Sequence, residues 1–434
     1  MRHETPHEIA QLLARYAPRN PQSVLDPAAG FGALAAPFIP RATRVYLLDI
    51  DPKAIARLTG SFGKLDSVTI TKTDFLRWSS SKGDGYRCRF DCIVMNPPFA
   101  GKLEDQVSIV PFGHAFVPKL PIEAAFVYQA VHLLRPKGRL LAIMPASVIS
   151  GENTKWLRRF LMQHGKVRLV HELPRYTFRG VEARIYLMVY ECGGTQGNLL
   201  SRNHRLTNPD ELVVRRSSLA EKMRFDFRFH EAQSWYERVR SSPKLEWKML
   251  GQAAEVVRGS VVSPVVSTEV LHTTNFFSHS LLRVNQEQCI ATLRDSGAAR
   301  SGDIVVKRVG RNCALSVRLY TQRTPVPCSD CIMIIRPRSA DGTQLLFAVR
   351  VLIAWSTGAG LVENGIGASY ISANVMRALE IPVNLAQIYP KTFMRFLAAL
   401  KHPDFKEAQK VESTVRRMLG RRRTDDDQRT SLHG

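Results

Sequence analysis

Short apolar runs alternate with helix-like stretches from the start of the chain to about Tyr190, and this alternation restricts the fold more than any other feature. The runs are rich in β-branched and large apolar residues, which is typical of strands buried on both faces of a sheet. They occupy residues 24–25, 45–48, 68–70, 92–95 and 140–144, with two more at 167–173 and 185–190. Strand–helix alternation predicts an α/β fold with a doubly wound, mostly parallel sheet.

A chain of 434 residues is too long for one typical domain, so we expect two. Residues 1–192 form the predicted domain with the parallel sheet. Residues 193–198 are rich in turn formers and the chain stays polar afterwards, which predicts a linker over 193–222. Residues 223–420 mix helical and strand-like segments and predict an α+β domain. A charged, solvated and disordered tail is expected at 421–434.

Basic residues outnumber acidic ones, with 61 Lys and Arg against 38 Asp and Glu and a net charge of +23. A surplus of this size predicts a polyanionic partner, nucleic acid first and an anionic membrane second. No apolar run has the length of a membrane span and no secretory signal is seen, so we expect a cytoplasmic protein. Seven scattered cysteines with a single C-x-x-C, at Cys328 and Cys331, indicate reduced thiols and no metal site.

Small and acidic residues follow the first two predicted strands, where the carboxyl ends of parallel strands meet. A glycine-rich turn runs from Asp26 to Gly32 and lets a ligand approach the backbone closely. Its spacing matches neither a dinucleotide fingerprint nor a phosphate-binding loop. After the second strand, Asp49 can accept both ribose hydroxyls of a nucleoside. Asp51, directly before Pro52, is better explained as a helix N-cap.

The third predicted strand leads to Asp74 and Phe75. Asp74 can accept the amino group of an adenine ring, and Phe75 can stack on that ring. Taken alone, each of these residues is better explained as an ordinary loop acid or a core aromatic. Because three such features follow successive strands in the expected order, the sequence predicts a nucleoside cofactor without phosphates.

The fourth predicted strand runs into Asn96-Pro97-Pro98-Phe99. Because the prolines lack N–H donors, the Asn96 side-chain oxygen and the Pro97 carbonyl can both accept hydrogen bonds from one planar amino group. Two acceptors localise the nitrogen lone pair and stabilise the positive charge that develops when the nitrogen attacks a methyl group. Phe99 offers a face for the target ring. The bare tetrapeptide is more often a rigid turn, but its place in this sheet favours methyl transfer to adenine, cytosine, guanine in RNA or a glutamine amide.

In this motif order the chain resembles the gamma-class DNA adenine-N6 methyltransferases, especially the TaqI-type enzymes and the modification subunits of type I restriction systems. The resemblance covers residues 3 to about 190 and implies a Rossmann-like, class I fold that binds S-adenosylmethionine. It implies cofactor contacts from Thr5, Asp26, Pro27, Ala28, Gly30, Gly32, Asp49, Ile50, Asp74 and Phe75. It implies a catalytic loop of Asn96, Pro97, Pro98 and Phe99, with Phe178 over a flipped adenine. For Phe178 a role as a core or loop aromatic is an open alternative.

The second half resembles the target-recognition domains of type I specificity subunits and TaqI-type enzymes. Residues 248–259 resemble their opening motif, residues 302–310 their central turn and strand, and residues 369–383 their closing segment. The resemblance gives the positive charge a place to act. Lys307, Arg308 and Arg311 are candidate DNA phosphate contacts, with a solvated basic loop as the alternative.

Together these features predict a monomeric DNA methyltransferase that flips an adenine out of double-stranded DNA and carries its own recognition domain. A cognate restriction endonuclease is a possible partner, and no nuclease motif stands out in this chain. Two alternatives stay open. One is an amino-methyltransferase that acts on RNA or on protein glutamine, and the other is a DNA-specificity protein whose methyltransferase half depends on a partner. The motif does not separate adenine from cytosine, and the recognition sequence is not readable.

Overall fold

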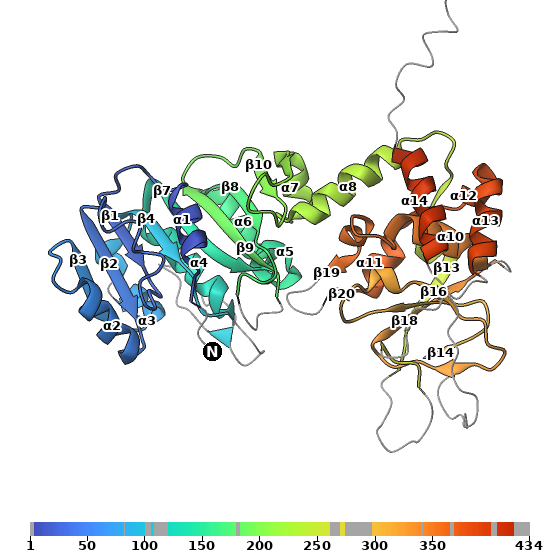
Figure 1. Cartoon of the computed structure of the whole chain (residues 1–434), viewed down its shortest axis with the longest axis horizontal. Coiled ribbons are helices and arrows are strands. Elements are labelled where there is room, and N and C mark those ends of the chain that lie inside the picture. Colours follow the sequence, from blue (N-terminus) through green and yellow to red (C-terminus); the bar gives the residue numbers. More distant parts are fainter. Residues whose placement is uncertain are drawn as a thin grey trace, which may run out of the picture. The chain divides into compact units, whose positions relative to one another are not determined.

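The computed structural model describes residues 4–81, 83–99, 106–107, 120–178, 183–260, 270–273, 297–339, 342–364, 369–400 and 406–420. The chain divides into two compact units, the first ending at His230 and the second beginning at Glu231 (Figure 1). The boundary falls within helix α8 (Phe227–Arg240). No helix of the described residues combines the length and the apolar character needed to cross a membrane.

The described residues of the first unit contain a nine-stranded sheet that confirms the predicted doubly wound, mostly parallel arrangement. Its strands, in order across the sheet, are β11 (Glu211–Val214), β10 (Leu199–Arg202), β8 (Gly165–Glu172), β9 (Ile185–Cys192), β7 (Leu134–Pro145), β4 (Phe90–Met95), β1 (Ser23–Asp26), β2 (Arg44–Asp49) and β3 (Val68–Lys72). The five strands β7, β4, β1, β2 and β3 are parallel to one another. β9 runs antiparallel between β7 and β8, so β7 and β8 point the same way.

Helices cover both faces of this sheet, because successive strand residues bury their side chains in different hydrophobic clusters. Leu25 and Ile93 pack with residues of α3, α4, α5 and α6, whereas Val24 and Val94 pack with residues of α1 and α2. The helices of the unit are α1 (His7–Ala14), α2 (Pro52–Phe62), α3 (Phe75–Ser81), α4 (Ile122–Leu133), α5 (Ala146–Ser150), α6 (Lys155–His164) and α7 (Arg216–Lys222). Burial on both faces explains why the strands read as apolar runs without polar alternation.

The predicted linker over residues 193–222 is wrong, because this stretch belongs to the first unit. β10 pairs with β8 and β11 pairs with β10, so the sheet continues through it. Leu199, Val214 and Leu219 are buried in the same cluster as α4 and α6. The Arg158 guanidinium donates to the Met223 carbonyl and holds the end of the stretch in place. The segment resembles a linker in sequence because its two strands are short and the loop 203–210 between them is mostly polar.

The second unit confirms the predicted mixed α+β domain. Its largest described sheet is antiparallel, with the order β13 (Ala254–Arg258), β18 (Ile332–Pro337), β15 (Ile304–Lys307) and β16 (Arg318–Leu319). Three short pairs join β12 (Trp247–Met249) to β21 (Glu380–Pro382), β14 (Ala298–Ala299) to β17 (Val326–Pro327), and β19 (Glu363–Asn364) to β20 (Tyr370–Ile371). The helices are α9 (Leu250–Ala253), α10 (Gly342–Ile353), α11 (Ala373–Ala378), α12 (Leu385–Ile388), α13 (Pro390–Leu400) and α14 (Lys406–Gly420).

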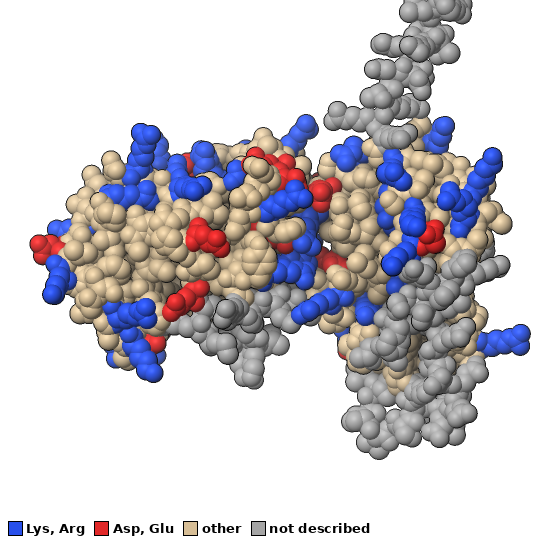
Figure 2. All heavy atoms as spheres, in the orientation of Figure 1, with Lys and Arg blue, Asp and Glu red and all other residues tan. Residues whose placement is uncertain are grey.

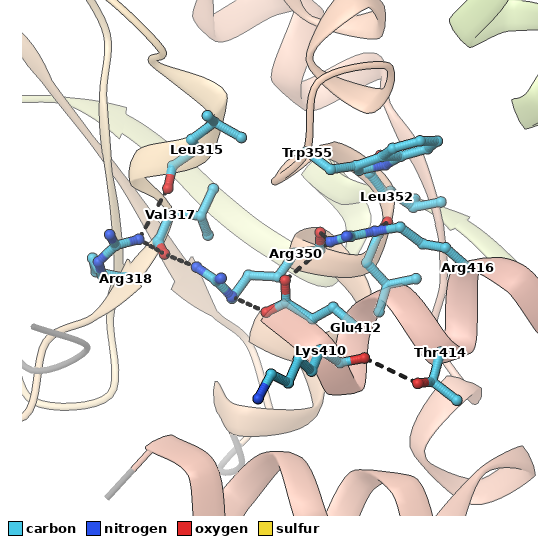
Figure 3. Close-up of polar contacts among 11 residues, drawn as sticks. Leu315, Val317, Arg318, Arg350, Leu352, Trp355, Lys410, Glu412, Thr414 and Arg416 are labelled. Carbon is cyan, nitrogen blue, oxygen red and sulfur yellow. Dashed lines mark hydrogen bonds and ion pairs between the residues drawn. The ribbon is translucent and has the colours of Figure 1, made fainter. Parts of the chain in front are cut away.

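A buried ion network fixes α14 against α10 in the second unit (Figure 3). Glu412 accepts hydrogen bonds from Arg350 at 2.5 Å and from Arg416 at 3.0 Å. Each guanidinium also donates to a backbone carbonyl, Arg350 to Val317 and Arg416 to Val351. Since a carboxylate removed from such a network leaves buried positive charge without compensation, Glu412 holds the packing of these helices together.

Candidate functional site

The predicted site residues meet at one edge of the sheet in the first unit. β1, β2, β3 and β4 are parallel, so their carboxyl ends lie at the same edge. The strand order reverses between β1 and β4, which is where open α/β sheets bind their ligands. Asp26 and Asp49 end β1 and β2, Asp74 follows β3, and Asn96 follows β4.

Two glycines shape the turn after β1. Gly30 and Gly32 have φ values of +57° and +87°, in the left-handed region that glycine adopts without strain. A Cβ atom at Gly32 would lie 2.7 Å from the Phe62 ring, so this position is also closed by packing against α2. A Cβ atom at Gly30 would have no described atom within 4 Å. The backbone at Gly30 therefore borders open space at the edge of the sheet.

Asp49 holds this turn against the end of β2. Its Oδ2 accepts a hydrogen bond from the Gly30 N–H at 2.8 Å, and its Oδ1 accepts one from the Asp51 N–H at 2.9 Å. Asp51 accepts from the Lys53 N–H at 2.8 Å, which confirms the predicted N-cap of α2. Between the two acids, the side chain of Ile50 is 63% exposed. An apolar surface thus lies beside a carboxylate that fixes the glycine turn.

Asp26 has a buried carboxyl group, one oxygen of which lacks a partner within the described residues. The residue is 1% exposed, and its Oδ1 accepts from the Ala28 N–H at 3.2 Å. Its Oδ2 has no hydrogen-bond partner within the described residues. Burial is the main reason that the pKa of Asp26 is raised from 3.8 to about 8; the Ala28 hydrogen bond opposes this rise and the charge of Asp49 adds to it. A cationic group bound beside Oδ2 would favour the ionised carboxylate and lower its pKa again.

Asp74 and Phe75 have structural roles that the motif alone did not reveal. Asp74 Oδ1 accepts from the Leu76 N–H at 2.8 Å and caps α3. Phe75 is 2% exposed, and its ring lies 4.9 Å from that of Phe126 in the core. These contacts agree with the alternatives of a loop acid and a core aromatic, and the cofactor roles of the two residues stay predictions.

The catalytic candidate Asn96 is joined to Thr5 across 91 residues of sequence. The Asn96 Nδ2 donates a hydrogen bond of 3.1 Å to the Thr5 hydroxyl. Thr5 and Pro97 are buried, Pro98 is exposed and Phe99 is half-buried. The structure therefore brings the N-terminal motif and the Asn-Pro-Pro-Phe loop to one place.

Phe178 and Phe99 both pack in the hydrophobic cluster that contains α1. Phe178 is 6% exposed and shares this cluster with Leu173 and Ile185, which flank it in the chain. Its position agrees with the alternative of a core aromatic. Whether the ring also covers a target base stays a prediction.

The three segments of the second unit that resemble recognition motifs contact one another. The opening and closing segments pair as β12 and β21, and the Leu250 N–H donates to the Leu379 carbonyl at 2.7 Å. The central and closing segments meet where the Gly310 N–H donates to the Ser369 carbonyl and the Ile371 N–H donates to the Arg308 carbonyl. Segments far apart in the sequence thus form one structural framework.

The three predicted phosphate contacts differ in their surroundings. The Arg308 Nε donates to the Asp330 carbonyl at 2.7 Å, and its guanidinium lies 3.8 Å from the Asp330 carboxylate. Lys307 is half-buried, and burial lowers its pKa, whereas Arg311 is exposed. Arg308 therefore holds the turn before β18, and its contact with DNA stays a prediction. Among the described residues, no group of three or more His, Cys, Asp or Glu is placed to hold a metal ion.

Comparison with known proteins finds relatives among restriction-modification proteins. Residues 45–178 match the family model of the Eco57I restriction-modification methylase. A type II restriction enzyme and methyltransferase, RM.BcgI of Heyndrickxia coagulans, is 25% identical over 212 residues, which are 44% of this chain and 31% of that protein. Defense against restriction protein B of Escherichia phage P1 is 26% identical over 160 residues, 36% of this chain and 6% of that protein. The chain thus matches less than a third of either relative.

Solved structures of restriction-modification proteins also align with the chain. The type IIG restriction endonuclease BpuSI is 14% identical, with 96% of this chain and 65% of that chain covered and a TM-score of 0.47. A type I methyltransferase subunit from Streptococcus thermophilus is 17% identical, with 51% and 52% covered and a TM-score of 0.39. Both TM-scores are below 0.5, so the type of domain is assigned from the matching family model and the sequence relatives. The first unit of this chain contains a methyltransferase domain of the restriction-modification type.

Proposed function

We propose that the chain transfers the methyl group of S-adenosylmethionine to the N6 of an adenine flipped out of double-stranded DNA, as part of a restriction-modification or related system. The observation that carries the proposal is the hydrogen bond from the Asn96 amide nitrogen to Thr5. It fixes the orientation of the one side chain that the reaction needs most, at the edge where the sheet binds ligands.

The bond to Thr5 supports an orientation in which the amide oxygen of Asn96 meets the substrate. Because the amide nitrogen donates to the Thr5 hydroxyl, the amide oxygen is the end that can accept from an amino group. Together with the Pro97 carbonyl it can hold both hydrogens of the adenine N6 and turn its lone pair toward the methyl donor. Two acceptors fixed before the reaction stabilise the positive charge on nitrogen without a reorganisation cost. The methylated nitrogen is acidic, so it needs no strong general base.

The chain offers contacts that fit each part of S-adenosylmethionine, whose sulfonium makes its methyl group electrophilic. The unsatisfied Asp26 Oδ2 fits the amino group of the methionine portion, near which Thr5 is expected to lie. Asp49 is the candidate for the ribose hydroxyls, and the exposed face of Ile50 is the candidate for one side of the adenine ring. Asp74 is the candidate for the adenine amino group. Open space beside Gly30 leaves room for the ligand.

Holding the target ring is assigned to Phe99, which is half-buried and directly follows the two prolines. Flipping costs the unstacking of one base, and stacking on an aromatic ring returns part of that free energy. Phe178 is the second candidate for this ring contact. We assign target recognition to the second unit, because its framework joins the three recognition-like segments and the chain carries a net charge of +23.

The test is a radiolabelled methyl-transfer assay with the full chain on DNA, RNA and protein. Asn96→Ala should abolish transfer and leave binding of S-adenosylhomocysteine, measured by calorimetry, nearly unchanged. Asn20→Ala is a matched control, because Asn20 is exposed and precedes β1 at the opposite edge of the sheet. Full activity of Asn96→Ala would refute the site. Transfer to RNA or to glutamine but not to DNA would select the rival amino-methyltransferase, and transfer only after a second protein is added would show partner dependence.

A further inference from the structure

A basic cavity lies at the same edge of the sheet as the proposed catalytic site. Its volume is about 600 Å³, and its lining includes Glu172, Arg175, Tyr176, His204, Arg205 and Arg228, all from the first unit. β8 ends at Glu172 and points the same way as β4, so the cavity and Asn96 share the carboxyl edge. Three strand positions separate β8 from β4, which corresponds to roughly 14 Å across the sheet.

The net charge of the cavity comes from Arg175 and Arg205. Glu172 is buried and forms an ion pair of 3.1 Å with Arg228, so these two charges cancel. Arg205 lies 3.9 Å from Asp210, and both side chains are well exposed. An exposed pair of this kind contributes little to stability, so Arg205 can exchange Asp210 for another anion at little cost. Arg175 forms no ion pair with the described residues.

The walls of the cavity are held in place before any ligand binds. His171 shares a hydrogen bond of 2.9 Å with the Arg205 carbonyl through its Nε2, and the Asn203 side-chain oxygen accepts from the Arg205 N–H. On the other wall, the Thr177 N–H donates to the Pro174 carbonyl and closes a tight turn. Two separate segments thus present their arginines from fixed backbone positions.

Tyr176 gives the cavity an aromatic surface. At 83% exposure it is the most exposed of the large hydrophobic side chains in the described residues. It lies in the turn between Glu172 and Phe178, the residue expected near the target base. An exposed aromatic ring next to two guanidiniums is the combination that binds unpaired bases and backbone phosphates of nucleic acids.

We propose that this cavity binds the backbone of the DNA strand that carries the target adenine, with Arg175 and Arg205 on phosphates and Tyr176 stacked on an adjoining unpaired base. The proposal rests on the proposed function, because it takes the Asn96 site as the place where the flipped base enters. A base rotates out of the duplex about its own backbone, so the flanking phosphates follow it toward the protein. Under this proposal the methyltransferase unit contacts DNA as well as the second unit. Basic side chains are spread over the visible face of each unit (Figure 2).

The experiment measures how the affinity of the full chain for a fluorescent DNA duplex with one unpaired base depends on salt. Each lost phosphate contact lowers the slope of log K against log salt by about 0.9, so Arg175→Ala/Arg205→Ala should lower it by about 1.8. Arg175→Lys/Arg205→Lys should keep a slope close to that of the wild type. The control Arg19→Ala/Arg44→Ala removes the same charge from exposed positions at the amino edge of the sheet and should not change the slope.

Stacking is tested on the same duplex. Tyr176→Ala should weaken binding about fivefold or more, whereas Tyr176→Phe should bind like the wild type. An unchanged slope in Arg175→Ala/Arg205→Ala, or an equal loss in the control pair, would overturn the cavity proposal. Stronger competition by a phosphoserine peptide than by DNA of equal phosphate concentration would also overturn it.

Methyl transfer measured in parallel separates this proposal from the proposed function. If the wild-type chain methylates no DNA but the slope falls as expected, the proposed function fails and the cavity stands as a DNA-binding site. If the wild type methylates DNA and the slope stays the same in Arg175→Ala/Arg205→Ala, only the cavity proposal fails.

Discussion

Replacing Asp26 by asparagine should make the first unit, free of cofactor, more resistant to unfolding at neutral and slightly basic pH. Burial raises the pKa of Asp26 from 3.8 to about 8 in the folded chain, so folding retains a proton that the unfolded chain releases. The stability that this group contributes is therefore complete below about pH 4 and is lost as the pH rises toward 8. A shift of about four pH units corresponds to about 5 kcal/mol, which is the upper limit of the loss.

Asparagine has nearly the shape of aspartate and does not titrate, so Asp26→Asn should remove this dependence on pH. Hydrogen exchange of the amides in β1 and β4 measures the opening free energy of the first unit, and the amides of β15 and β18 in the second unit provide an internal control. We expect protection in β1 to fall between pH 5 and 8 in the wild type and to stay constant in the variant. Equal pH dependence in the two proteins would refute the reasoning.

The same carboxyl should couple cofactor binding to proton release. A cofactor ammonium group beside the Asp26 Oδ2 favours the ionised form, so binding of S-adenosylhomocysteine at pH 7 should release about one proton. Calorimetry in buffers of different ionisation enthalpy counts this proton. Asp26→Asn should bind the ligand more weakly and release none, and proton release that persists in the variant would assign the proton to another group.

Three further substitutions test separate parts of the structure. Thr5→Val removes the acceptor of the Asn96 amide and should slow methyl transfer about tenfold in single-turnover assays, with cofactor affinity changed far less. Gly32→Ala places a methyl group against Phe62 at a positive φ and should destabilise the first unit by about 2 kcal/mol, measured by hydrogen exchange. Glu412→Gln leaves two buried guanidiniums without their carboxylate and should destabilise the second unit by about 3–5 kcal/mol in chemical denaturation. Wild-type values in any of these measurements would contradict the role given to that residue.

The sheet was predictable from the sequence because its central strands are buried on both faces. Residues such as Val24 and Leu25 contact different hydrophobic clusters, so both must be apolar and the strand reads as an uninterrupted apolar run. The last two strands of the sheet follow another rule. β10 and β11 have only four residues each, and the mostly polar loop 203–210 between them makes the segment read as a linker.

The site was predictable as a set of strand ends, but not in its contacts. Sequence order placed Asp49, Asp74 and Asn96 after successive strands, and the fold brings these ends to one edge. Sequence could not show that Asp74 also caps α3, because a cap and a ligand contact require the same residue type. Nor could it show the bond between Thr5 and Asn96, which depends on tertiary structure.

The basic cavity could not be predicted from any one stretch of the sequence. Its lining comes from three separate segments, at residues 172–176, 204–207 and 228, and only the fold brings them together. Arg308 shows the reverse case, since it stands in a basic stretch that suggested DNA contact but forms an ion pair with Asp330 in the folded chain. Charge read along the sequence does not separate arginines that are already paired from those that can meet a phosphate.

The most direct test of the proposed function is the chemical identity of the methylated base. The full chain should be expressed in a bacterial host that lacks DNA methylation, and the digested DNA of that host should be analysed by mass spectrometry beside DNA from cells that express Asn96→Ala. We predict N6-methyladenine in the first sample and none in the second. N4-methylcytosine, or the absence of any methylated base, would contradict the assignment of this chain as an adenine methyltransferase.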